Sequence, residues 1–235
     1  MTRIQWLMPG AVWAMDDMGT CRKGKIHHVR DAASRYDLTL LPAARLPGKE
    51  VARNLKELIE LHGPPLVAKR DNGSNLNDEA VNEVLERYAI IPLNSPPHYP
   101  RYNGQIERGQ REVGEELDTF PTAVPITSPE GKERLGLVRE ALAHRHRPCL
   151  GGRIAEDVFQ SGRERMSWYN QDRRIAALEH IERMSAEIIE REGLWTKRTV
   201  ARAWRRAVET WLLQEGIIAI EKGESVTPFP SILVS

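Results

Sequence analysis

The sequence predicts an α/β domain, a mixed five-stranded sheet flanked by helices, followed by a helical C-terminal extension. Three observations support this prediction. Three strand-like segments follow one another near the N-terminus, two helix-and-strand pairs come next, and long charged helical segments fill the last part of the chain. Consecutive strands favour antiparallel pairing, whereas a helix between two strands favours a crossover and parallel pairing. One sheet is therefore expected to contain both kinds of pairing.

Short apolar segments bounded by Gly, Pro, Asn or Asp indicate where the strands lie. They are expected at residues 10–18, at 25–43 as two strands broken near Ala33 and Ser34, and at 65–69 and 89–93. Apolar residues that recur at helical spacing indicate the helices. These are expected at residues 48–63, 77–88, from 104 to about 117, up to about 146, and at 172–192 and 197–216.

A change in composition predicts a domain boundary near residue 165. Residues 1–165 hold the five expected strands, and residues 166–235 are mainly helical, with a short strand and a tail at the end. A chain of 235 residues is long enough for one sizeable domain with an appendage.

Composition and charge exclude several classes of protein. The net charge is +1, so the overall balance does not point to any partner. The two cysteines, Cys21 and Cys149, lie far apart without metal-ligand spacing, which is typical of a reducing compartment. No apolar run approaches the roughly 20 residues that cross a bilayer. We therefore expect a cytoplasmic chain without a membrane partner.

Three acidic side chains are expected to meet at one edge of the sheet. Asp16 and its neighbour Asp17 lie in the first strand. Asp71 follows the fourth strand, and Glu107 lies in the first turns of the helix after the fifth. Ligands of such sheets bind at the carboxyl ends of strands, and Mg²⁺ or Mn²⁺ would relieve the repulsion between carboxylates there. Two ions about 4 Å apart can promote phosphoryl transfer.

Each acid alone has a simpler explanation. Asp71 within Asp-Asn-Gly fits a turn, and Glu107 with Arg111 fits an ion pair on a solvated helix. Asp16 alone could mark the end of a strand. The joint arrangement of the three favours a metal site.

The residues around these acids resemble those of the DDE transposases and retroviral-type integrases, which have an RNase H-like fold. The resemblance covers roughly residues 10–160 and depends on the segments "VWAMD", "KRDNGS", "SPPHYPRYNGQIER" and "HRHRPCLGGRIAEDVF". Thirty-five residues separate Asp71 from Glu107, which is the family's hallmark interval. In the last segment Ile154 and Ala155 replace the family's usual Thr-Pro. The resemblance implies that residues 1–165 are an integrase catalytic core.

The resemblance also implies an activity and its residues. The family's Trp-x-x-Asp pattern falls on Trp13 and Asp16, so Asp16, Asp71 and Glu107 are the expected catalytic residues and the ligands of two Mg²⁺ or Mn²⁺ ions. Asp17 is expected to point to the opposite sheet face, because side chains alternate along a strand. The implied function is DNA integration or transposition, through cleavage and transfer of DNA strands.

Basic and polar residues are expected to contact DNA at two places. Beside the acids these are Lys69, Arg70, Tyr102, Asn103, Arg108 and Arg111, of which Tyr102 and Asn103 shape the lip of the site by resemblance. On the helix at 197–216 they are Lys197, Arg198, Arg202 and Arg205. Such a basic stripe could bind DNA phosphates, but a helix face that is simply exposed to solvent explains the same residues equally well. The tryptophans are expected in the core, namely Trp13, Trp168, Trp195, Trp204 and Trp211.

The resemblance implies further partners. A homo-oligomer of this chain would bind the ends of a mobile element and the target DNA. When bound to DNA, it would be associated with the bacterial nucleoid. The expected core begins about 10 residues from Met1, whereas family members often carry an N-terminal DNA-binding domain. Three explanations of this early start are open. The chain could work with a separate DNA-binding subunit, it could be a fragment of a longer protein, or its C-terminal helices could recognise the DNA ends. Two other functions stay open, a nuclease of the same fold that cuts without joining and a domesticated DNA-binding remnant.

Overall fold

The computed structural model describes residues 2–20, 23–96, 102–121, 123–193, 195–222 and 225–226. The chain divides into two compact units, one of residues 9–169 and one that combines residues 1–8 with 170–235. The domain boundary expected after residue 165 stays a prediction, and that residue lies within α6 (Arg163–Ser167). None of the helices in the described ranges is long and apolar enough to span a bilayer.

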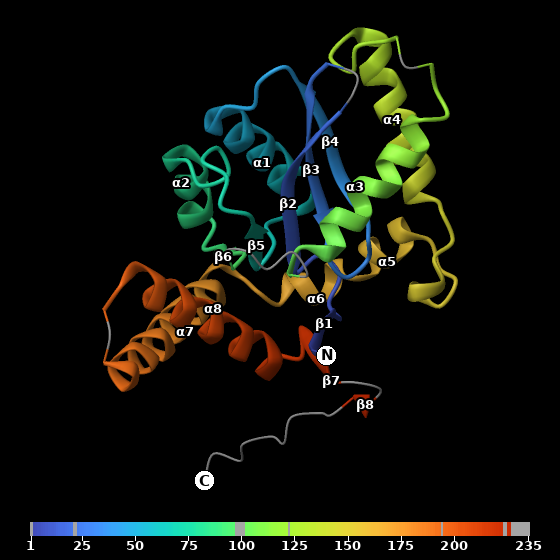
Figure 1. The fold of residues 1–235 in the computed structure, drawn as a ribbon. Coiled ribbons are helices and arrows are strands. Elements are labelled where there is room, and N and C mark those ends of the chain that lie inside the picture. The colour runs from blue at the N-terminus through green and yellow to red at the C-terminus, as the bar shows by residue number, and fades with distance from the viewer. Residues whose placement is uncertain are drawn as a thin grey trace. The chain divides into compact units, whose positions relative to one another are not determined.

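The larger unit is built on a mixed five-stranded sheet, as the sequence predicts (Figure 1). In sheet order the strands are β4 (Asp37–Ala43), β3 (Lys25–Asp31), β2 (Val12–Gly19), β5 (Val67–Arg70) and β6 (Ile91–Asn94). β3 pairs antiparallel with β2 and β4, whereas β5 runs parallel to both β2 and β6. The carboxyl ends of β2, β5 and β6 therefore lie at one edge of the sheet.

Helices cover both faces of this sheet (Figure 1). They are α1 (Gly48–His62), α2 (Glu79–Arg87), α3 (Gly104–Leu117), α4 (Pro129–Ala143), the short 3₁₀ helix η2 (Pro148–Leu150), α5 (Ala155–Ser161) and α6. α1, α2 and α5 pack with Trp13 and Met15 on one face. α3 and α4 pack with Ile26 and Leu40 on the other. The two faces thus have separate apolar cores.

Local signals explain where these helices begin and end. Asp78 caps α2 by accepting a hydrogen bond from the Ala80 amide, and Ser128 caps α4 by accepting one from the Gly131 amide. α1 ends at Gly63, whose φ of 79° suits glycine. These are the capping residues that sequence analysis looks for at helix ends, so the predicted helices of the larger unit agree with the structure.

The smaller unit combines a helix pair with a three-stranded sheet. Its elements are β1 (Thr2–Trp6), α7 (Gln171–Glu192), α8 (Lys197–Gln214), β7 (Ile218–Lys222) and β8 (Ser225–Val226). β7 pairs antiparallel with both β1 and β8. Thr196 and Thr199 form a capping box at the start of α8. The strand β1 was not predicted, because its partner strand β7 is more than 200 residues away in the sequence and no local pattern reveals the pairing.

The predicted core role of the tryptophans is only partly correct. Trp13 and Trp211 are buried. Trp168 and Trp195, however, are 62% and 72% exposed, so that prediction was wrong for these two residues. Trp168 follows the end of α6 and Trp195 precedes the cap of α8. Neither lies on the apolar stripe of a helix, which explains why neither is buried.

Candidate active site

β2 directs Asp16 and Asp17 to opposite faces of the sheet, as strand alternation predicts. The side-chain amide of Gln110, on α3, donates to Asp16 Oδ2 over 3.0 Å. Asp17 Oδ1 lies 2.8 Å from His27 Nδ1, and Asp17 Oδ2 accepts a hydrogen bond from Asn75 over 2.7 Å. Asp16 therefore faces α3, and Asp17 faces away from it.

The environment of Asp16 disfavours its negative charge. Burial raises the pKa of the Asp16 carboxyl above its ordinary value, and the nearby Asp71 carboxylate raises it further. Hydrogen bonds from the Asp17 amide and from Gln110 act in the opposite direction without cancelling the shift. A cation beside these two acids would favour the charged forms, because an opposite charge stabilises an ionised carboxylate.

Asp71 lies just beyond β5, at the edge where the parallel strands end. Its Oδ1 accepts a hydrogen bond from the Gly73 amide over 2.7 Å, and its carbonyl accepts one from the side chain of Asn77 over 2.9 Å. A Cβ atom on Gly73 would lie 2.9 Å from Asp71 Oδ1, so a larger residue there would require the carboxylate to shift. The turn expected from Asp-Asn-Gly is thus also the feature that orients Asp71.

Two expected DNA contacts, Arg70 and Lys69, are buried at 5% and 4% exposure. The Arg70 guanidinium donates to Asn94 Oδ1, to the Leu76 carbonyl and to Asn82 Oδ1 over 2.9, 2.6 and 2.8 Å. Burial lowers its pKa to about 10. Both side chains thus have partners within the protein, and their contact with a DNA backbone stays a prediction. All four residues of β5 are buried, and sequence proximity to Asp71 could not show this.

The expected lip residues attach the start of α3 to the sheet. Asn103 occupies the N-cap position of α3 but makes no capping hydrogen bond with its side chain. Its Oδ1 instead accepts hydrogen bonds from Lys69 Nζ, over 2.6 Å, and from Ser95 Oγ. Lys69 Nζ also lies 4.6 Å from the centre of the Tyr102 ring. A DNA contact by Tyr102 or Asn103 stays a prediction.

Glu107 is exposed in the first turn of α3. Gln110 lies three residues later, on the same side of the helix, and it reaches Asp16. The side of α3 that carries Glu107 is therefore the side nearest Asp16. Across the described ranges, no three His, Cys, Asp or Glu side chains are grouped closely enough to hold a metal ion. The role of Glu107 as the third ligand stays a prediction, and residues 97–101 before α3 lie outside those ranges.

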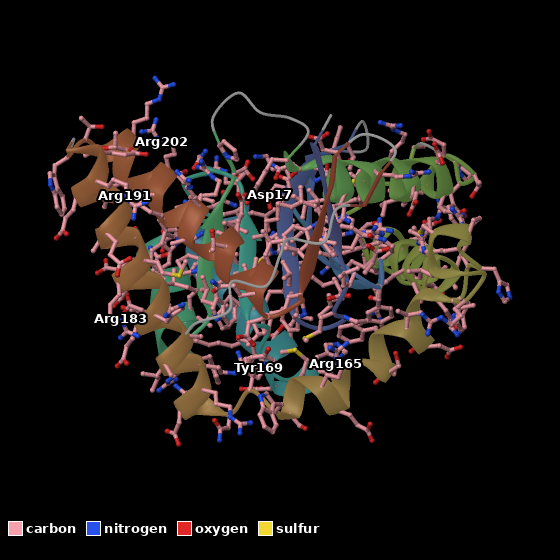
Figure 2. All side chains as sticks on the ribbon, turned by 90° about the horizontal axis from the view of Figure 1, so that it is seen from below. Asp17, Arg165, Tyr169, Arg183, Arg191 and Arg202 are labelled. Atoms are coloured by element: carbon pink, nitrogen blue, oxygen red, sulfur yellow. The ribbon has the colours of Figure 1, made fainter. Side chains whose placement is uncertain are left out.

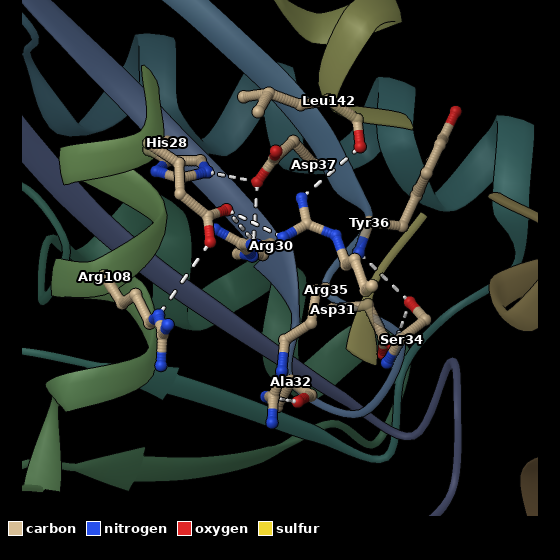
Figure 3. A network of polar contacts seen from close by, with 12 residues as sticks. His28, Arg30, Asp31, Ala32, Ser34, Arg35, Tyr36, Asp37, Arg108 and Leu142 are labelled. Carbon is tan, nitrogen blue, oxygen red and sulfur yellow. Dashed lines mark hydrogen bonds and ion pairs between the residues drawn. The ribbon is translucent and has the colours of Figure 1, made fainter. Parts of the chain in front are cut away.

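A buried network of charged side chains attaches α3 to β3 and β4 (Figure 3). Arg30 Nη2 and Arg147 Nη1 each donate to Glu112 Oε2 over 2.9 Å. Asp37 Oδ1 lies 3.4 Å from Arg30 Nε and 2.6 Å from His28 Nε2. This network was not predicted, because its members come from four separate segments of the sequence. By fixing Glu112, the network fixes the rotation of α3 on the sheet.

Gly109 provides a test of how tightly α3 fits the sheet. A Cβ atom on Gly109 would lie 1.9 Å from Arg30 Nη1, whereas a Cβ atom on Gly114, in the same helix, would meet nothing within 4 Å. We expect Gly109→Ala to destabilise the protein by about 1–3 kcal/mol through overpacking. Gly114→Ala should stabilise it by about 1 kcal/mol, because alanine favours helix. Urea unfolding compares them, and equal stability of the two variants would contradict the close packing.

The remaining expected DNA contacts are mostly on the surface. Arg108 and Arg111 are exposed on α3, and Arg108 lies 4.0 Å from Glu112. On α8, Lys197, Arg198 and Arg202 are exposed and Arg205 is half-buried. Figure 2 shows Arg202 at the outside of the helix pair, as it shows Arg183 and Arg191 of α7. These side chains are accessible, but contact with DNA stays a prediction.

The sheet order, the helices on both faces and the acids at the carboxyl edge together define an α/β unit of the RNase H-like fold class. The comparisons with solved structures agree with this class. An HTLV-2 integrase catalytic core solved with magnesium aligns with a TM-score of 0.54 and 18% identity, over 66% of this chain and 99% of that core. The catalytic core of BIV integrase aligns with a TM-score of 0.55 and 18% identity, over 68% and 99%. The fold predicted from the sequence is thereby confirmed.

Longer proteins match over only part of their length. A simian T-cell lymphotropic virus intasome chain, solved with PP2A regulatory subunit B56 gamma, aligns with a TM-score of 0.58 and 18% identity, over 66% of this chain and 56% of its own. The Gag-Pro-Pol polyprotein of mouse mammary tumor virus (strain BR6) is 24% identical over 125 residues, which is 52% of this chain and 7% of the polyprotein. No protein-family model matches the chain. Residues of this chain thus share the fold of retroviral integrase catalytic cores, and the chain spans only a small part of the polyprotein that it matches.

Proposed function

We propose that the chain is a DNA integrase or transposase, which cleaves and joins DNA strands with divalent metal ions. The observation that supports this most directly is the position of Asp16 and Asp71. They are neighbouring carboxylates at the carboxyl edge of the sheet, and the raised pKa of Asp16 reflects burial and the charge of Asp71. Glu107, the proposed third acid, lies three residues before Gln110 on α3, and Gln110 donates a hydrogen bond to Asp16.

The donor set fits Mg²⁺ or Mn²⁺, both of which prefer carboxylate and water oxygens. Asp16, Asp71 and Glu107 are the proposed ligands of two ions, and no soft sulfur ligand lies among them. When bound, such ions neutralise the charge on the attacking and leaving oxygens of an in-line phosphoryl transfer. For Glu107 to join the other two acids, the start of α3 must move or its side chain must change rotamer.

The proposed reaction has two phosphoryl transfers. Water attacks a phosphodiester at the end of the donor strand and releases a free 3′-OH. That hydroxyl then attacks a phosphodiester of the target, whose own 3′ oxygen leaves, so bonds formed equal bonds broken. Asp16 and Asp71 would hold the metal ions that supply charge stabilisation to the reacting phosphate, and no side chain would become covalently attached to DNA.

The basic side of α8, in the smaller unit, is a second proposed surface for DNA. We expect Lys197→Gln with Arg198→Gln to weaken DNA binding and to reduce the slope of log affinity against log salt by about 1–2, because each lost phosphate contact releases one fewer counterion. A matched control is Lys49→Gln with Arg53→Gln, two exposed cations on α1. Fluorescence anisotropy at several salt concentrations gives the slopes, and equal slopes for both pairs would exclude this surface.

An assay that does not require known DNA ends tests the proposed function. Duplexes with randomised terminal sequences are incubated with the protein, a supercoiled target plasmid and Mg²⁺ or Mn²⁺, and new junctions are sequenced. Joined products support the integrase or transposase activity. Nicks without junctions would favour a nuclease of the same fold, and binding without either product would favour a domesticated remnant.

Assembly into a homo-oligomer on DNA is also proposed. The similar HTLV-2 core was solved in trimeric and dimeric forms, and the similar simian viral chain was solved in an intasome. Two DNA ends must be held together for joint insertion, which requires more than one active site. A separate DNA-binding subunit remains compatible with this proposal, and sedimentation with and without DNA would measure the assembly.

A further inference from the structure

On the sheet face opposite Asp16, three side chains form a chain of hydrogen bonds. His27 is fully buried on β3, directly across from Asp17 in the strand register. Its Nδ1 lies 2.8 Å from Asp17 Oδ1, and Asn75 donates to Asp17 Oδ2 over 2.7 Å. Both oxygens of Asp17 are therefore engaged, one by the sheet and one by the loop that follows β5.

The tautomer of His27 follows from its surroundings. Among the described residues, its Nε2 is buried without a hydrogen-bond partner, whereas its Nδ1 faces a carboxylate oxygen. A carboxylate accepts hydrogen bonds, so Nδ1 carries the proton and donates it to Asp17. His27 thereby fixes the rotamer of Asp17, which leaves Oδ2 directed at Asn75.

Asn75 belongs to the same short loop as Asp71. In that loop the Gly73 amide donates to Asp71 Oδ1, and the side chain of Asn77 donates to the carbonyls of Asp71 and Gly73 over 2.9 and 2.8 Å. The loop is thus a small hydrogen-bonded unit that includes the Asp71 carboxylate. Among these hydrogen bonds, the one from Asn75 crosses to β2, the strand that carries Asp16.

We propose that Asn75, held by Asp17 and His27, is a positioning residue that sets the distance between Asp71 and Asp16. Asp17 is then no metal ligand but an anchor, which explains why two adjacent aspartates occupy β2. This inference depends on the proposed metal site, because it concerns the geometry of two of its three ligands. It adds residues on the far face of the sheet that the family resemblance does not assign.

The test compares Mn²⁺ affinity among variants of the full chain. Asn75→Ala removes the hydrogen bond to β2, and we expect it to weaken Mn²⁺ binding about tenfold, the size expected of one lost hydrogen bond. Ser74→Ala changes the exposed neighbour in the same loop and should bind as the unmodified chain does. Asp17→Asn keeps an acceptor for His27, and its amide can donate to the Asn75 side-chain oxygen, so affinity should be retained.

Hydrogen exchange supplies a second measurement that does not need the metal. The Gly73 amide donates to Asp71 Oδ1 and the Asn77 amide donates to the Gly73 carbonyl, so both amides report on the loop. In Asn75→Ala these amides should exchange faster, while the melting temperature stays close to that of Ser74→Ala. If Asn75→Ala does not fold, Asn75→Ser takes its place in the same comparison.

The outcomes separate this inference from the proposed function. If Asn75→Ala binds Mn²⁺ as tightly as Ser74→Ala, the positioning role is overturned while the metal site stands. If weaker binding comes with a general loss of stability, the role is structural only and the inference is also overturned. If the unmodified chain binds no Mn²⁺, the proposed metal site is wrong. The positioning role of Asn75 is then wrong too, even if hydrogen exchange shows that Asn75 keeps the loop ordered.

Discussion

Replacing Asp16, Asp71 or Glu107 with its amide is expected to abolish metal-dependent DNA cleavage while DNA binding is retained. Metal ions supply several kcal/mol of charge stabilisation in the transition state. Losing one of their ligands should therefore reduce the cleavage rate by about 1,000-fold or more. Asp17→Asn is the matched control, because it alters the neighbouring carboxylate on the opposite face of the sheet.

The same substitutions should not unfold the protein. Since the folded state raises the pKa of Asp16, its ionised carboxylate destabilises the fold at neutral pH, and Asp16→Asn should leave the melting temperature unchanged or higher. Gel assays of cleavage, anisotropy with labelled DNA, and thermal unfolding measure the three properties. Loss of folding in all three amide variants would mean that these acids have a structural role.

Glu112→Gln is expected to have the largest effect on stability. It removes the carboxylate that pairs with Arg30 and Arg147, whose side chains are only 3% and 6% exposed. Breaking a buried pair of this kind costs about 3–5 kcal/mol, since unpaired charge stays buried. Unfolding should therefore begin roughly 10 °C lower at neutral pH. Glu115→Gln, an exposed position on the same helix, should change stability by less than about 0.5 kcal/mol.

The effect of Glu112→Gln should depend on pH in a defined direction. Burial alone would raise the pKa of Glu112, but Arg30 and Arg147 hold it below its ordinary value of 4.5. The stabilisation is therefore fully present above pH 4.5 and is lost as the pH falls through the lower pKa of the folded state. Urea unfolding at pH 7 and at successively lower pH should show the two proteins converging. A constant difference, or none at pH 7, would contradict this account of the network.

The sheet and its helices could be predicted because their signals are local. Strand alternation separated Asp16 from Asp17, and the cap residue Asp78 marks a helix start that the structure contains. Pairing of β1 with β7 could not be predicted, since it joins the two ends of the chain. Local signals thus determine which elements form, and long-range contacts determine how they join.

The site was less predictable than the fold. The burial of Lys69 and Arg70 depends on how β5 lies between β2 and β6, which local sequence does not show. Likewise Arg30 and Glu112 are 82 residues apart in the sequence, and no pattern in either segment predicts that they pair. The positions of acids at strand ends follow from the sheet, but the side chains that orient them come from the packed structure.

Mn²⁺ binding, measured by calorimetry, decides whether these acids form a metal site. The measurement compares the unmodified chain with Asp16→Asn, Glu107→Gln and Asp17→Asn. We predict saturable binding that is lost with Asp16→Asn and with Glu107→Gln and retained with Asp17→Asn. Binding that is absent from the unmodified chain, or unaffected by the first two substitutions, would contradict a catalytic metal site formed by these acids.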